Sequence, residues 1–155
     1  MKKVSCLVIG AGERRVEGAT HHDVQKLEGI DIVCDIFDLP KKTKVIYDEV
    51  YLTHVLEHFP MNETLAVLET VRQLLKKGGV LYIEVPNFYW HALKMLENPL
   101  NRQIVEYAYG GQKNKWDFHY NGFTPEILHE DLTSAGFEVG QLVPNSSIEC
   151  WSVKL

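Results

Sequence analysis

Short apolar runs rich in β-branched residues recur along the chain, and glycine, proline or charged residues interrupt them. Such runs, bounded by turn-forming residues, are typical of β-strands. By this criterion the sequence predicts seven strands, at Val4–Ile9, Ala19–Val24, Ile30–Asp35, Glu49–Thr53, Val80–Val85, Glu138–Val143 and Ile148–Lys154.

A helical pattern is clearest between Asn62 and Lys76. Apolar residues recur there at intervals of three and four, which places them on one face of a helix. Asn62 is a suitable N-cap, and Gly78 can adopt the left-handed conformation that ends many helices. The expected buried positions are Leu65, Leu68, Val71 and Leu75.

Further helices are expected in the second half of the chain. One runs from Pro125 to about Ala135, because a threonine precedes the proline as a cap and a glycine follows as a stop. Two shorter helices are expected between Phe88 and Tyr109, with a break at Asn98-Pro99.

The order of these elements predicts the fold class. Strands that alternate with helices form a parallel α/β sheet. The link Pro144-Asn145-Ser146-Ser147 is so short that the last two strands must be antiparallel neighbours. The link from Gly12 to the second strand has about ten residues, which is short for a helical crossover. We expect a mostly parallel sheet of seven strands that ends in an antiparallel hairpin and has a reduced first helix.

Composition restricts the function classes. The 155 residues correspond to one domain, 1–155. The net charge is −5, and no run of basic residues exceeds two, which disfavours a surface for nucleic acid. No apolar stretch reaches the roughly 20 residues that span a bilayer. We therefore expect neither nucleic acid nor membrane as a partner.

Two observations predict a cytoplasmic protein. Cys6, Cys34 and Cys150 lie in apolar runs without a CxxC pattern, as expected of buried, reduced thiols. The charged start Met1-Lys2-Lys3 is followed by an apolar run, Val4–Ile9, that is short and lacks a small-residue cleavage site. That run is predicted to be a strand rather than part of a signal peptide.

The candidate chemistry lies in the turns that follow the predicted strands. Open α/β sheets bind ligands beyond the carboxyl ends of their strands. Gly10-Ala11-Gly12 follows the first strand, and glycines there let the backbone approach a ligand closely. Because Arg15 stands where a dinucleotide fold has a third glycine, a ligand without phosphate suits this loop better.

Acidic residues follow the next two strands. Asp23 ends the second strand, where a carboxylate can accept hydrogen bonds from ribose hydroxyls. Asp35 ends the third strand, with Asp38 as an equally polar neighbour. The simpler alternative for each is an aspartate in a solvated turn.

The segment His54-Val55-Leu56-Glu57-His58 has two interpretations. Its H-x-x-E-H pattern is that of inverted zinc peptidases, which need both histidines on one helical face. A strand runs into His54 and Pro60 follows closely, so little more than one helical turn fits. A third ligand, Glu126 or Glu130, is not clearly placed, and no metal site is predicted. A hydrogen-bonded Glu57–His58 pair that fixes the loop is the structural alternative.

Several passages together resemble the class I S-adenosylmethionine (SAM)-dependent methyltransferases, especially the small methyltransferase type 11-like group. The resemblance extends from Leu7 to Phe137, and only the glycine loop departs, with Glu13 in place of a small residue. It implies a three-layer, Rossmann-like α/β/α fold with SAM as cofactor. The matching passages are Gly10-Ala11-Gly12, Leu56-Glu57-His58, Gly78-Gly79, Val85-Pro86-Asn87, His119, Phe123-Thr124-Pro125-Glu126 and Ala135-Gly136-Phe137.

The resemblance also implies residue roles. The glycine loop lies against the cofactor, the acid after the second strand binds the ribose, and the acid after the third strand binds the adenine with the next backbone amide. Backbone at the end of the fourth strand faces the methionine part. The cofactor-binding residues expected on this basis are Gly10, Ala11, Gly12, Asp23, Asp35, Ile36, Thr53 and His54.

A base is needed only where the acceptor must lose a proton early. Histidine titrates near neutrality, so His119 is the first candidate, followed by His58 and His54. Ligand pockets are commonly lined by aromatic side chains. Those that can line an acceptor site are Trp90, Tyr107, Tyr109, Trp116 and Phe118.

The expected activity is transfer of the SAM methyl group to an O, N or C nucleophile of a small molecule. Two other functions compete with it. A SAM-binding subunit or regulator without activity would explain the altered glycine loop. A zinc hydrolase would use His54, Glu57 and His58, and it is the less favoured of the two.

Overall fold

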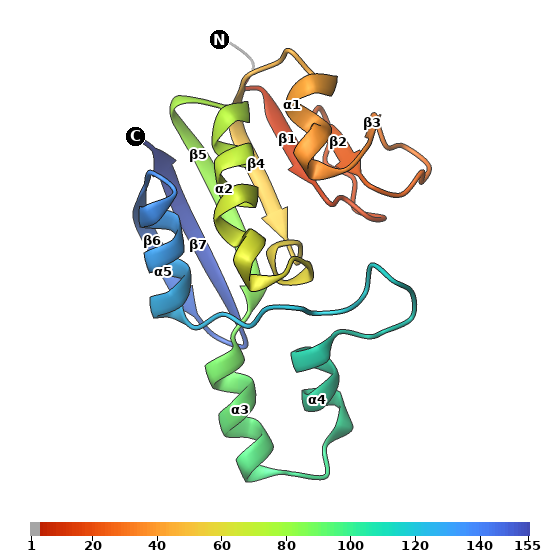
Figure 1. Ribbon diagram of the computed structural model, residues 1–155, viewed down its shortest axis with the longest axis vertical. Coiled ribbons are helices and arrows are strands. Elements are labelled where there is room, and N and C mark those ends of the chain that lie inside the picture. The colour runs from red at the N-terminus through yellow and green to blue at the C-terminus, as the bar shows by residue number, and fades with distance from the viewer. Residues whose placement is uncertain (1–3) are drawn as a thin grey trace.

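Seven strands form one sheet in the order β3-β2-β1-β4-β5-β7-β6 (Figure 1). The computed structural model describes residues 4–155, and the charged residues Met1–Lys3 lie outside this range. Every expected strand is present, with shifted ends. The strands are β1 Cys6–Ile9, β2 Thr20–Asp23, β3 Ile32–Val33, β4 Tyr47–Thr53, β5 Leu75–Pro86, β6 Phe137–Pro144 and β7 Ser147–Lys154.

The direction of the strands confirms the predicted fold class. Strands β3, β2, β1, β4 and β5 are parallel neighbours, and β7 is antiparallel to both β5 and β6. The helices are α1 Leu39–Lys42, α2 Thr64–Leu74, α3 Phe88–Glu97, α4 Arg102–Tyr109 and α5 Pro125–Ser134, with 3₁₀ turns η1 Ile36–Asp38, η2 Leu56–His58 and η3 Met61–Glu63. None is long and apolar enough, within residues 4–155, to cross a membrane.

The helix expected to reach Lys76 ends earlier, at Leu74. Leu75 is already extended and pairs with Tyr47 of β4, so sheet pairing overrides the helical preference of the two lysines that follow. Gly78 has the expected positive φ of 74°, but it lies within β5 rather than at the helix end. The other end is also shifted, because residues Met61–Glu63 form a 3₁₀ turn before α2.

The segment between β3 and β4 contains a short helix that the periodicity did not reveal. Asp35 caps the 3₁₀ turn Ile36–Asp38, and α1 follows with Pro40 in its first turn. The predicted strand 30–35 is correspondingly reduced to Ile32–Val33. Of the three cysteines, which are all free, only Cys150 is fully buried; Cys6 and Cys34 are half-buried, contrary to expectation.

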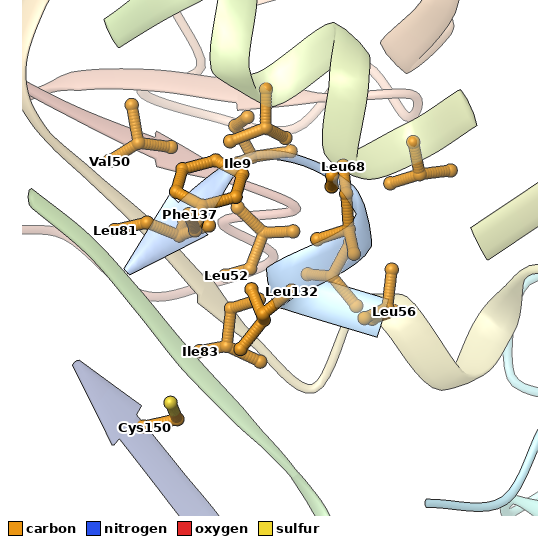
Figure 2. Packing of buried hydrophobic residues seen from close by; sticks show 14 of the residues in the cluster. Ile9, Val50, Leu52, Leu56, Leu68, Leu81, Ile83, Leu132, Phe137 and Cys150 are labelled. Atoms are coloured by element: carbon orange, nitrogen blue, oxygen red, sulfur yellow. The ribbon is translucent and has the colours of Figure 1, made fainter. Parts of the chain in front are cut away.

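The hydrophobic core lies on one face of the sheet. Alternate residues of the central strands point toward α2 and α5, which cover that face (Figure 2). The packed residues include Ile9, Val50, Leu52, Leu81 and Ile83 from strands and Leu68, Leu132 and Phe137 from the covering layer and β6.

The expected three-layer arrangement therefore needs a correction. In residues 4–155, α1, α2 and α5 lie on the same face, and no helix covers the other (Figure 1). Right-handed crossovers that run in opposite directions along a sheet place their helices on opposite faces. Here the connections β1–β2 and β2–β3 contain no helix, so the second of the two expected helical layers is missing. The reduction of the first helix was predicted, but its consequence for the layers was not.

On the open face, aromatic side chains of adjacent strands lie next to one another. Tyr51, Tyr82 and Trp151 are register partners on β4, β5 and β7. Their ring centroids are 5.5 Å apart for the tyrosines and 4.8 Å for Tyr82 and Trp151. These three aromatic rings pack against one another and cover part of the sheet face that bears no helix in residues 4–155. They therefore provide apolar packing on that face as well.

Helices α3 and α4 extend beyond the carboxyl edge of the sheet (Figure 1). Both were expected, and each begins at an asparagine cap: Asn87 accepts from the Trp90 amide and Asn101 from the Gln103 amide. The chain then returns along residues 110–122 to the same edge before α5. This return places a long loop beside the ends of the parallel strands.

Candidate active site

A pocket of about 390 Å³ lies at the carboxyl ends of the parallel strands, within the size range of small-molecule sites. It is bounded by the turns after β1, β2, β3 and β4 on one side and by the returning loop on the other. Its lining residues are Ile9, Gly10, Gly12, His22, Asp23, Val24, Gln25, Asp35, Ile36, His54, Val55, His58, Phe59, Lys115, Trp116 and Tyr120.

The glycine loop has the conformation that its residue types permit. Gly10 and Gly12 have φ of 62° and 53°, in the left-handed region that favours glycine. A Cβ on Gly10 would lie 2.5 Å from Cγ2 of Val55, whereas a Cβ on Gly12 would meet nothing within 4 Å. Gly10 thus lets the β4 turn approach closely, and Gly12 leaves room for a ligand.

The acid after β2 holds this loop in place. Asp23 is buried, its Oδ2 accepts from the Gly12 amide at 2.8 Å and its Oδ1 accepts from the Gln25 amide at 2.8 Å. Each carboxylate oxygen retains a second lone pair for a ligand hydroxyl. The acid expected to bind a ribose is therefore also the clamp that shapes the glycine loop.

The acid after β3, Asp35, has fewer hydrogen bonds within the protein than Asp23. Asp35 is exposed, and its Oδ1 accepts from the Phe37 amide at 3.0 Å as the cap of the 3₁₀ turn. Ile36, which follows, is buried and contributes an apolar wall. Both lie at the pocket, whereas Asp38 does not line it and bonds Lys41 at the surface.

Two of the eight expected cofactor residues do not line the pocket. Ala11 is buried behind the glycines, and its amide donates to the His22 carbonyl. Thr53 accepts from Nη1 of Arg14 at 2.7 Å, so its side chain ties the glycine loop to the end of β4. The sequence could not distinguish these two residues from the pocket residues, because each is adjacent along the chain to a residue that lines the pocket.

His54 occupies a strained position at the end of β4, with φ of 53°. Its Nδ1 lies 3.1 Å from Oε1 of Glu57 and its Nε2 lies 3.4 Å from Oε1 of Glu84. The hydrogen bond to Glu57 is the main reason that the pKa of His54 is raised. Because His54 follows a strand and only Leu56–His58 form a 3₁₀ turn, the helix that a zinc-peptidase motif needs is absent.

The other two candidate histidines are neighbours. The rings of His58 and His119 meet edge to face, with centroids 4.9 Å apart, and His58 lines the pocket. Burial lowers the pKa of His119, which favours its neutral form. His54 and His58 line the pocket, and His119 lies against His58, so all three histidines lie near Glu57. The H-x-x-E-H pattern placed His54, Glu57 and His58 close together, but no spacing along the chain indicated that His119 joins them.

The outer wall of the pocket was only partly anticipated. Of the five aromatic residues expected at an acceptor site, only Trp116 lines the pocket, together with Tyr120 and Lys115. The pocket also includes His22, which is buried and carried no recognisable signal in the sequence. The remaining aromatic candidates (Trp90, Tyr107, Tyr109 and Phe118) lie elsewhere.

Comparison with known proteins gives a family. A sequence profile described as a methyltransferase domain matches residues 7–142. No curated protein sequence matches the chain significantly.

Solved structures share the fold. One is a 1,6-didemethyltoxoflavin-N1-methyltransferase from Burkholderia thailandensis with bound S-adenosylhomocysteine, 18% identical over 97% of this chain and 71% of that one, with a TM-score of 0.67. A SAM-dependent methyltransferase from Methanosarcina mazei is 14% identical over 100% and 94%, with a TM-score of 0.64. Another from Archaeoglobus fulgidus is 16% identical over 97% and 86%, also at 0.64.

The profile spans most of the chain, and the solved structures agree with its sheet. The resemblance that the strand-end turns suggested is confirmed. The chain belongs to the methyltransferase domain family, and its fold is that of the SAM-dependent methyltransferases with which it is compared.

Proposed function

We propose that the protein transfers the methyl group of SAM to an O, N or C nucleophile of a small molecule that enters beside the returning loop. The observation that carries this proposal is the two-sided pocket. The glycine loop and the acids after β2 and β3 bound one side, and Lys115, Trp116 and Tyr120 bound the other.

We assign the adenosyl group to the first side. Asp35 accepts from the adenine amine, Asp23 accepts from the ribose hydroxyls, and Gly12 admits the ligand because nothing fills the space beside its Cα. His54 then lies near the methionine part. In this arrangement His58, which also lines the pocket, would lie near the methyl group that is transferred.

The chemistry needs little from the protein besides alignment. The acceptor attacks the methyl carbon, the carbon–sulfur bond breaks, and its electron pair stays on sulfur as S-adenosylhomocysteine forms. Holding donor and acceptor in contact supplies much of the rate enhancement. A proton released by the acceptor leaves through the cluster of His54, His58 and His119.

The test measures cofactor binding. We expect SAM and S-adenosylhomocysteine each to stabilise the wild-type protein in a thermal shift experiment, by about 2.7 kcal/mol when the ligand is a hundredfold above its Kd. Asp35→Ala should reduce this shift, because an acceptor at the pocket is lost. The matched control is Asp38→Ala, which removes an acid three residues away that does not line the pocket.

The proposal would be wrong if neither ligand shifts the wild-type protein at millimolar concentration. Equal loss of the shift in Asp35→Ala and Asp38→Ala would overturn the adenine assignment while leaving cofactor binding intact. With binding established, transfer of isotope-labelled methyl to members of a small-molecule panel identifies the acceptor.

A further inference from the structure

Glu57 is a buried carboxylate with one oxygen left unpaired. The residue is only 1% exposed. Its Oε1 faces Nδ1 of His54 at 3.1 Å, whereas its Oε2 is buried and has no hydrogen-bond partner. An unpaired buried carboxylate oxygen is costly, and such groups in proteins are usually paired or bound to a metal ion.

The side chains of His58 and His119 are each oriented by a hydrogen bond to a backbone carbonyl. Nδ1 of His58 lies 2.9 Å from the Phe118 carbonyl, and Nδ1 of His119 lies 3.0 Å from the Tyr107 carbonyl. A carbonyl only accepts, so each Nδ1 carries a hydrogen and donates it. In the neutral ring this leaves the lone pair on Nε2, which is the tautomer that metal-binding histidines adopt when a carbonyl orients them.

The three groups converge although they come from distant parts of the chain. One ligand atom from each of Glu57, His58 and His119 lies within 4.8 Å of the other two. The returning loop is fastened to the 3₁₀ turn η2, because the amides of Tyr120 and Asn121 both donate to the Glu57 carbonyl, at 2.9 and 3.2 Å. The backbone thus fixes the relative position of the ligands before any ion binds.

We propose that Glu57, His58 and His119 bind one divalent first-row transition metal ion. Two imidazoles and a carboxylate suit zinc, iron, cobalt or manganese, whereas Mg²⁺ and Ca²⁺ prefer oxygen ligands alone. Bonds from zinc to histidine nitrogen are about 2.0–2.1 Å long, so the three ligand atoms, which lie within 4.8 Å of one another, need to move only slightly to reach one ion.

This site differs from the one that the H-x-x-E-H pattern would suggest. His54 is not a ligand, because its two ring nitrogens already face Glu57 and Glu84. It orients the carboxylate instead, as outer partners of metal ligands do. The third ligand comes from the returning loop, His119, rather than from Glu126 or Glu130 of α5.

The position of the site gives the ion a role, which rests on the proposed function. His58 lines the pocket, so an ion bound to its Nε2 adjoins the space where the acceptor enters. A metal ion lowers the pKa of a bound hydroxyl and leaves an oxygen nucleophile at neutral pH. With the ion bound, His58 and His119 act as ligands, so the hydroxyl proton leaves to solvent rather than through these two histidines, and the proposed acceptors are molecules that present an oxygen.

The experiment uses chelator-treated protein without SAM, so that its outcome is independent of methyl transfer. We expect calorimetric titration with Zn²⁺ to give one ion per chain, and Co²⁺ to give the visible spectrum of a nitrogen-coordinated ion. Nuclear magnetic resonance of ¹⁵N-labelled imidazoles should show Zn²⁺ shifting Nε2 of His58 and His119 but neither nitrogen of His129, an exposed residue of α5.

Glu57→Gln and His119→Ala should each weaken Zn²⁺ binding by more than about 100-fold, since even changes to outer partners cost 10–100-fold. His129→Ala is the matched control and should bind as the wild type does. Thermal unfolding of each metal-free variant, measured without SAM, verifies that the fold is intact. Absence of stoichiometric Zn²⁺ and Co²⁺ binding, or equal binding by all variants, would overturn the metal site and leave the methyltransferase proposal untouched.

Discussion

At the scale of single residues, two glycines with the same conformation serve different purposes. Gly10 and Gly12 both have positive φ, yet only Gly10 is crowded, by Val55 of the β4 turn. The first glycine therefore contributes to packing between two strand ends, and the second keeps the pocket open. The repeated Gly-x-Gly pattern conceals this difference, because contact with Val55 depends on a residue 45 positions away.

This difference predicts that the two glycine substitutions lower the free energy of unfolding by different amounts. Gly12→Ala lowers it only by the penalty of a non-glycine residue in the left-handed conformation, about 1–2 kcal/mol. Gly10→Ala adds to that an overlap in a packed region, about 1–3 kcal/mol more. Urea unfolding measures both. The double variant Gly10→Ala/Val55→Ala should lose less than the sum of the single variants, and equal losses for the two glycine variants would contradict the argument.

At the scale of elements, one carboxylate joins the starts of three neighbouring strands. Asp48 of β4 accepts from the amide and hydroxyl of Ser5, just before β1, at 2.8 and 2.7 Å. Lys76 of β5 donates to its other oxygen at 2.6 Å. The Lys76 ammonium and the Ser5 donors hold the pKa of Asp48 well below its usual range. The end of the sheet opposite the pocket is thus stabilised by a group that must stay ionised.

A pH dependence follows from that depressed pKa. A carboxyl group whose pKa is lower in the folded state stabilises the protein above its unfolded pKa, about 3.9, and this contribution is lost as the pH falls further. Unfolding free energies measured between neutral pH and pH about 2 should therefore decline less steeply in Asp48→Asn than in the wild type. Identical slopes would show that other carboxylates cause the acid sensitivity.

The Asn variant needs a control because it also alters hydrogen bonds at neutral pH. Asp38→Asn changes a surface carboxylate that bonds only Lys41 nearby and joins no strands. We expect its pH profile to lie closer to that of the wild type, since exposed ion pairs contribute little to stability.

At the scale of the whole molecule, the core is one-sided. Helices α2 and α5 cover one face of β1, β4 and β5, while the edge strand β3 has only two residues. Helices α3 and α4 each contain a single buried residue, His91 and Ile104. Resistance to local opening depends on burial, so stability should be concentrated in the central strands and their helices.

Hydrogen exchange tests this distribution. We expect amides of β4, β5 and α2 to exchange only through global unfolding, and those of β3, α3 and α4 to exchange faster through local opening. Addition of SAM should slow exchange in the turns after β1 and β3, which line the pocket. Exchange of α3 and α4 at the rate of the central strands would show that they belong to the cooperative core.

The sequence by itself determined the number of strands and their succession along the chain, the final hairpin, the helices after residue 88 and the edge of the sheet that holds the site. These follow from periodicity, caps and loop lengths, which are local properties of the chain. Only the tertiary structure decided that Leu75 joins the sheet, that one face bears no helix within residues 4–155, and that Asp23 clamps the glycine loop. The convergence of Glu57, His58 and His119 belongs to this second group, because contacts between segments 60 residues apart depend on how the loops return to the sheet.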